Sequence, residues 1–170
     1  MTGRFHRGLI AVERGVAVVL LVATFTVILL QVFTRYVLGD PLSWTEELAR
    51  FLLVWLAFVA AGYCTAERLH ISVDLLLARL GRRAGAVVDT FANVAVVVAA
   101  GALAVAGAAF AADSTGLRAP ATGLPMAVVY GAGALGFALV VLHGAGNAVH
   151  NLRRPEDVPG AMESAEREGA

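Results

Sequence analysis

Charged residues are absent from four long stretches of this chain. These stretches cover residues 15–34, 51–66, 90–112 and 119–152. A helix needs about 20 mostly apolar residues to cross the hydrocarbon core of a bilayer, which is roughly 30 Å thick. The pattern predicts an all-α membrane protein whose membrane domain, residues 1–154, precedes a polar cytoplasmic tail, residues 155–170. The four transmembrane helices are expected at about residues 11–34, 44–66, 84–112 and 125–149.

Composition supports a membrane protein and argues against other classes. Apolar residues make up 59% of the 170 residues and charged residues 15%, whereas about a quarter of the residues in a soluble domain are charged. The 13 basic residues balance 13 acidic ones, so the chain lacks the net positive charge that nucleic-acid binding requires. The single cysteine, Cys64, excludes an internal disulfide and a multi-cysteine zinc site. We expect no enzyme activity, no catalytic or metal-binding residue and no cofactor.

Arginine placement predicts the orientation of the chain. Three arginines, Arg35, Arg50 and Arg118, fall on one side of the predicted membrane domain, and nine fall in the N-terminus, the loop after the second span and the start of the tail. Because cytoplasmic segments carry an excess of basic residues, both termini are expected in the cytoplasm. The first span is expected to be an uncleaved anchor, since no small-x-small cleavage site follows it.

The centres of the predicted spans contain no ionisable residue. Pumps and ion-coupled carriers place such residues at mid-membrane, where they are costly and functional. The third span instead has alanines at four-residue spacing (Ala100, Ala104, Ala108 and Ala112), and the fourth is rich in glycine. Small residues allow helices to pack closely in lipid. The pattern favours a partner or scaffold subunit over an independent carrier.

The junction before the second span contains a cluster of charges. Ser43 and Glu46 have the spacing of a capping box, which predicts a helix start at Trp44. Glu46 and Glu47 lie in the first turn, and each could pair with Arg50. Such a cluster is either a solvated helix end or an anchor that fixes the helix against a partner at the outer membrane surface.

The loop after the second span predicts a short amphipathic helix in the membrane interface. Its apolar residues recur at helical spacing from Val73 to Leu80, close to several arginines. His70 and Asp74 lie at its start. One histidine and one aspartate are too few for a metal cage, so a structural hydrogen-bonding role is the simpler interpretation.

Three segments carry a family resemblance. They are Arg35-Tyr36, the run from Asp40 to Arg50 (DPLSWTEELAR), and the run from Glu67 to Asp74 (ERLHISVD). With the length and the four spans, they make the chain resemble the small membrane subunit, of the DctQ type, of tripartite ATP-independent periplasmic (TRAP) transporters. The motif residues to which the resemblance points are Arg35, Asp40, Pro41, Trp44, Glu46, Glu47, Arg50, His70 and Asp74.

The resemblance implies a function and partners. In this family, a small four-helix subunit associates with a large permease subunit that holds the substrate and sodium sites. A periplasmic substrate-binding protein delivers the substrate, usually a carboxylate. The chain would then be a scaffold subunit in the lipid bilayer of the bacterial inner membrane, with no role in nucleic-acid binding.

Other classes of membrane subunit remain as alternatives. A haem-bearing anchor subunit would need two axial ligands, and the candidates are His70, His143 and His150. His143 and His150 lie seven residues apart, about 10.5 Å along a helix axis, so they cannot clamp one iron. A purely structural membrane anchor and a small autonomous exporter are the other possibilities.

Overall fold

The computed structural model describes residues 2–67 and 82–153. In this part of the chain, four long helices are present and no strand is formed. The helices are α1 (Thr2–Phe33), α2 (Ser43–Ala66), α4 (Arg82–Asp113) and α5 (Met126–Arg153). Each contains a stretch long and apolar enough to cross a membrane. The predicted all-α membrane fold is confirmed. The predicted interfacial helix, His70, Asp74 and the tail lie outside the described residues.

Helix α1 begins earlier than predicted, and helical structure continues past its last residue. It begins at Thr2 rather than near residue 11, and it continues into a single π-helical segment, η1 (Thr34–Leu38). The chain then turns at Gly39, whose φ of +71° lies in the left-handed region that glycine adopts without strain. Helix α5 begins at Met126, one residue after the proline at which its start was predicted.

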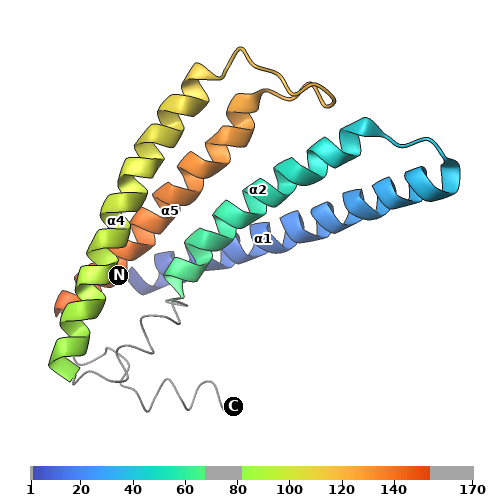
Figure 1. Cartoon of the computed structure of the whole chain (residues 1–170). Helices are drawn as coiled ribbons and strands as arrows, with labels where there is room; N and C mark the ends of the chain where they lie inside the picture. The colour runs from blue at the N-terminus through green and yellow to red at the C-terminus, as the bar shows by residue number, and fades with distance from the viewer. Residues whose placement is uncertain (1, 68–81, 154–170) are drawn as a thin grey trace, which may run out of the picture.

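The four helices form two hairpins that diverge from one another (Figure 1). Helix α1 packs on α2, α4 packs on α5, and the contact between α2 and α5 joins the hairpins. We call the end where α1 begins and α5 finishes the terminal end. The opposite end, which carries the connections 39–42 and 114–125, is the loop end. At the loop end, the 114–125 connection bends toward the start of α2 (Figure 1).

Glycines allow α2 and α5 to approach closely. A Cβ atom on Gly136 would lie 2.6 Å from Phe58 Cβ and 2.8 Å from the Phe58 carbonyl oxygen. A Cβ on Gly62 would lie 2.9 Å from Leu139 Cβ. The Phe58 ring also meets Phe137 edge to face, with centroids 5.3 Å apart. Van der Waals packing of this kind drives helix association in lipid, where apolar burial alone gives little preference.

The inward face of α4 differs from the predicted stripe of alanines. Ala100 is buried and Ala104 half-buried, but Ala108 and Ala112 are exposed. The stripe continues instead through Gly107, where a Cβ would lie 3.3 Å from the Ala134 amide nitrogen. Residues spaced strictly four apart move gradually around a helix that has 3.6 residues per turn. The residues that face one neighbouring helix are therefore spaced alternately three and four apart.

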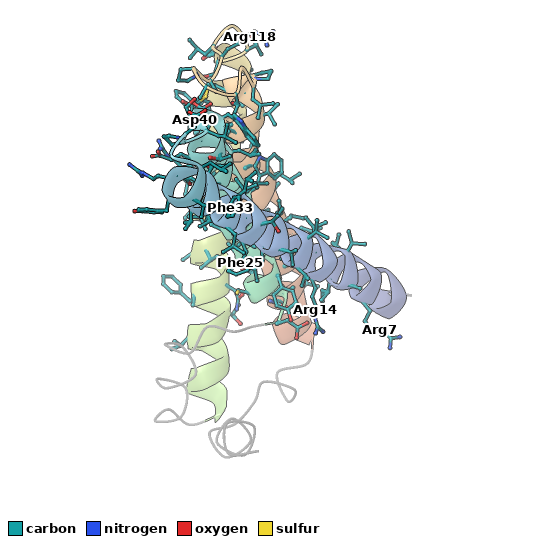
Figure 2. The ribbon with its side chains drawn as sticks, turned by 90° about the vertical axis from the view of Figure 1, so that its right-hand side faces the viewer. Arg7, Arg14, Phe25, Phe33, Asp40 and Arg118 are labelled. Atoms are coloured by element: carbon teal, nitrogen blue, oxygen red, sulfur yellow. The ribbon has the colours of Figure 1, made fainter. Side chains whose placement is uncertain are left out.

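The inner helices are better covered than the outer ones. Within the apolar stretches, 22% of α2 and 28% of α5 residues are buried, against 6% for both α1 and α4. Large apolar side chains therefore cover the outward sides of α1 and α4, and Phe25 and Phe33 of α1 are examples (Figure 2).

Candidate functional site

The start of α2 is built differently from the predicted capping box. The helix already includes Ser43, and the residue before it, Leu42, makes no side-chain cap. The Thr45 hydroxyl donates instead to the Leu42 carbonyl oxygen at 2.6 Å, and Thr45 is fully buried. The capping-box prediction was wrong because Ser43 lies one position inside the helix, whereas a capping hydroxyl must belong to the residue before the first turn.

Glu46 and Arg50 form the predicted ion pair at the surface of α2. The Arg50 Nη2 and Glu46 Oε1 atoms are 3.2 Å apart. The two side chains are 67% and 64% exposed, so in the isolated chain the pair is solvated. Exposed pairs of this kind contribute about 0.3–0.5 kcal/mol to a helix.

Glu47 has a different role and reaches a distant segment. Its Oε2 atom accepts hydrogen bonds from the backbone N–H groups of Ala121, at 3.2 Å, and Thr122, at 2.7 Å. The Thr122 hydroxyl donates to the same oxygen at 2.7 Å. One carboxylate on α2 thus binds the connection between α4 and α5, and it joins the two hairpins at the loop end.

The connection from 114 to 125 is folded so that it can offer these donors. The Ala119 N–H donates to the Leu124 carbonyl at 2.9 Å. Gly123 has a φ of +69°, and the Arg118 guanidinium donates to its carbonyl oxygen at 3.1 Å. A turn closed in this way directs successive N–H groups outward, which is the geometry of a backbone anion-binding site.

The other motif residues at the loop end are exposed. The side chains of Arg35, Asp40, Pro41 and Trp44 all reach the surface, and Asp40 lies at the same end as Arg118 (Figure 2). The surface formed by the following residues is called the loop-end surface: Arg35, Asp40, Pro41, Trp44, Glu46 and Arg50. The structure brings these residues to one end of the molecule.

A buried pair at the terminal end was not predicted from the sequence. Glu13 Oε1 of α1 lies 2.8 Å from His143 Nε2 of α5, and the side chains are 4% and 1% exposed. The other oxygen, Glu13 Oε2, has no hydrogen-bond partner among the described residues. The pair connects the outer helix of one hairpin directly to the inner helix of the other.

Asn147 extends this polar contact by one turn of α5. Its Nδ2 atom donates to the Thr65 carbonyl oxygen of α2 at 2.9 Å. The spacing of His143 and Asn147, four residues apart in an otherwise apolar helix, is a signal that could have indicated a shared inward face. Glu13 gives a matching signal, since it opens an inward-facing series at alternating steps of four and three: Glu13, Ala17, Leu20, Thr24, Val27, Gln31 and Thr34.

The described residues contain no cluster of three or more potential metal ligands. His143, one of the candidate haem ligands, has its Nε2 atom engaged by Glu13. His70 lies outside the described residues. The hydrogen bonds of Glu47, Glu13 and Asn147 each join helices or segments that are far apart in the sequence.

Residues 24–154 match the DctQ component of tripartite ATP-independent periplasmic transporters. The match covers well over half of the chain, and the chain belongs to this family of membrane transporter components. It is a multi-pass membrane protein.

Individual relatives resemble parts of the chain. The sialic acid TRAP transporter small permease protein SiaQ of Vibrio cholerae is 30% identical over 96 residues, which are 56% of each protein. A putative TRAP transporter small permease protein of Haemophilus influenzae is 40% identical over 53 residues, or 31% of this chain and 33% of that protein. The sialic acid TRAP transporter permease protein SiaT of Haemophilus influenzae is 28% identical over 79 residues, which are 46% of this chain and 13% of SiaT. The chain therefore aligns with about half of the length of SiaQ and with less of the other two.

Proposed function

We propose that this protein is the small scaffold subunit of a sodium-coupled TRAP transporter. It associates with a large permease subunit, and a periplasmic substrate-binding protein delivers an organic acid to the assembled complex. The names of the relatives support this proposal, since SiaQ is a small permease protein and SiaT a permease protein of sialic acid TRAP transporters. Sialic acid is itself an organic acid, which fits the proposed class of substrate.

One observation supports the scaffold role above the others. The buried ionisable pair of the described helices, Glu13 with His143, is used to join α1 to α5. That pair lies toward the terminal end, and the central turns of the spans contain no charged residue that could bind a carboxylate or sodium. Since ion-coupled carriers require such groups at mid-membrane, the substrate and sodium sites belong to the large subunit.

The outward sides of α1 and α4 fit the proposed surroundings. They expose large apolar side chains along their length, including Phe25, Phe33 and Phe91. Apolar surface of this extent needs cover from lipid or from another membrane subunit. We propose that the bilayer and the large subunit cover these sides, while the loop-end surface contributes polar contacts to a partner.

We further propose that the protein lies in the bacterial inner membrane with both termini in the cytoplasm. The loop end then faces the periplasm. Reporter fusions at Gly39 and Gly116 should report a periplasmic position, and fusions at Gly3, Gly81 and Gly160 a cytoplasmic one. A cytoplasmic reporter at Gly39 would contradict this orientation.

Uptake by purified components tests the functional proposal. Proteoliposomes that contain this chain, the large subunit and the binding protein should accumulate the organic acid when a sodium gradient is imposed. Omission of the small chain should abolish or strongly reduce uptake. The chain alone should transport nothing, and sodium-driven uptake by the chain alone would refute the scaffold role and favour the autonomous exporter.

A further inference from the structure

Apolar side chains stand clear of the rest of the protein where the helical structure of α1 and η1 ends. Tyr36, Val37 and Leu38, which we call the elbow, are between 63% and 79% exposed. Figure 1 shows this end of the chain at the far right, away from α4 and α5. Successive residues of a helix point in different directions, so the helix end is uncovered on several sides. Exposed apolar clusters mark surfaces that a membrane or another molecule covers.

The depth of the elbow in a bilayer follows from the charge-free stretch of α1. Residues 15–34 contain no charge, and a helix of this length spans about 30 Å, the thickness of a hydrocarbon core. Phe25 lies at the middle of the stretch. Tyr36 lies eleven residues farther along the chain, which is about 16.5 Å along an ideal helix axis and close to half of that thickness. The elbow is therefore at the boundary between acyl chains and headgroups.

The backbone of the elbow needs hydration although its side chains are apolar. The Thr34 carbonyl oxygen accepts hydrogen bonds from the N–H groups of Gly39 and Asp40, and Pro41 has no N–H to donate. Within the described residues, no hydrogen bond from the following connection reaches the carbonyl oxygens of the elbow. Unpaired carbonyls are costly in hydrocarbon and in a dry protein interface, but water binds them at a helix end. The headgroup boundary supplies that water and still covers apolar side chains.

The elbow also continues an apolar surface that faces outward from α1. Phe25, Leu29 and Phe33 follow one another at four-residue steps and are all exposed, and Figure 2 shows Phe25 and Phe33 along α1. Tyr36 and Val37 come one turn after Phe33. Because α1 crosses the membrane, this surface leads directly from the hydrocarbon core to the elbow. Tyrosine is enriched at that level of a bilayer.

We propose that the elbow is a membrane-interface anchor. Tyr36, Val37 and Leu38 insert at the boundary between headgroups and acyl chains, in the leaflet that surrounds the loop end, while their carbonyl oxygens stay hydrated. The anchor fixes the depth of the connection 39–42 and of the start of α2. The proposal concerns lipid contact alone, and it depends neither on the proposed transport role nor on which leaflet faces the cytoplasm.

Fluorescence quenching by brominated lipids measures the depth of the elbow. The full chain with Trp44→Phe and Trp55→Phe receives one new tryptophan at a time and is reconstituted into phosphatidylcholine liposomes. Tyr36→Trp should lose more fluorescence to lipids brominated near the headgroup than to lipids brominated near the chain end. Phe25→Trp, at the middle of the span, should show the opposite order. Asp40→Trp, which changes an exposed residue just after the elbow, is the matched control and should be quenched weakly by both lipids.

Further arms separate lipid from water and from protein as the cover of the elbow. Acrylamide, a water-soluble quencher, should act more strongly on Asp40→Trp than on Tyr36→Trp. Leu38→Trp repeats the depth measurement at a second elbow residue, and circular dichroism checks that each variant is folded. Equal acrylamide quenching without an effect of bromine would place the elbow in water and overturn the proposal. Loss of the lipid quenching when the large permease subunit is reconstituted with the chain would assign the elbow to a protein interface and would also overturn it.

Discussion

Glu13 and Glu47 each bind a distant segment and connect the two hairpins, but at opposite ends and in different surroundings. Glu13 is buried, and its partner is a single ionisable side chain, His143. Glu47 is half-buried and binds two backbone N–H groups and one hydroxyl of the 114–125 connection. The terminal end therefore relies on one specific side-chain pair, whereas the loop end relies on the shape of a backbone turn.

This difference determines how each end responds to substitution. A buried ionisable group that loses its partner stays buried without regaining hydration by water. Removal of the partner therefore lowers the free energy of unfolding of the whole fold. When a carboxylate near the surface is removed, water can accept the hydrogen bonds from its former donors. The stability that is lost is therefore mainly that of the loop that the carboxylate orders. The contrast predicts a global effect at the terminal end and a local effect at the loop end.

The largest effect is expected from Glu13→Leu. His143 would then be left buried without this partner, and the free energy of unfolding should fall by about 3 kcal/mol or more. Reversible unfolding in mixed micelles measures the change. The double variant Glu13→Leu with His143→Leu should recover much of the loss, because a buried ion pair can be replaced by apolar residues at little cost.

Glu46→Leu is the matched control, because it removes an exposed carboxylate. It should change stability by a few tenths of a kcal/mol. Equal destabilisation by Glu13→Leu and Glu46→Leu would contradict the contrast between the two ends.

A smaller global effect is expected from Gly136→Ala, midway between the two ends. The added Cβ would lie within 3 Å of the Phe58 backbone, so α2 and α5 must separate, at a cost of about 1–3 kcal/mol. Gly131→Ala is the control, since no atom lies within 4 Å of its Cβ position. Thermal unfolding in detergent compares the two variants, and equal melting temperatures would show that the hairpins are not in close contact here.

The fold class was predictable because the signals for transmembrane helices lie in the local sequence. Charge-free stretches and helical length depend on neighbouring residues, so residues 15–34 and 90–112 indicate spans without any tertiary information. The pairing of Glu46 with Arg50 was predictable for the same reason, since four residues span one helical turn.

The contacts between hairpins were not predictable in the same way. Glu47 and Thr122 are 75 residues apart, and Glu13 and His143 are 130 apart. No local pattern specifies which turn will meet which helix. The capping box failed for a related reason: its spacing allowed Ser43 to precede the helix, but the chain begins the helix at Ser43 and uses Thr45 to bind the preceding carbonyl.

At the loop end, Glu47→Gln should affect the 114–125 connection alone. The amide side chain can still accept a hydrogen bond but no longer carries the charge that strengthens three of them. Amide hydrogen exchange at Ala121 and Thr122 should become roughly tenfold faster, while exchange in the centres of α2 and α5 stays unchanged. Glu46→Gln is the matched control on the same turn. Faster exchange throughout both hairpins would indicate that Glu47 supports the whole fold, as Glu13 is expected to do.

The smallest effect on the isolated chain is expected from Arg50→Ala. Because the Arg50–Glu46 pair is about two-thirds exposed, its removal should cost only a few tenths of a kcal/mol in detergent.

The result should differ in the complex if the loop-end surface contacts a partner, since Glu46 would then be left partly desolvated without its cation. We expect Arg50→Ala to weaken co-purification with the large subunit and to lower uptake. The swap Glu46→Arg with Arg50→Glu should restore part of both, though not all, because it places a cation in the first turn of α2. Normal assembly and uptake in Arg50→Ala would assign the Arg50–Glu46 pair to a solvated helix end.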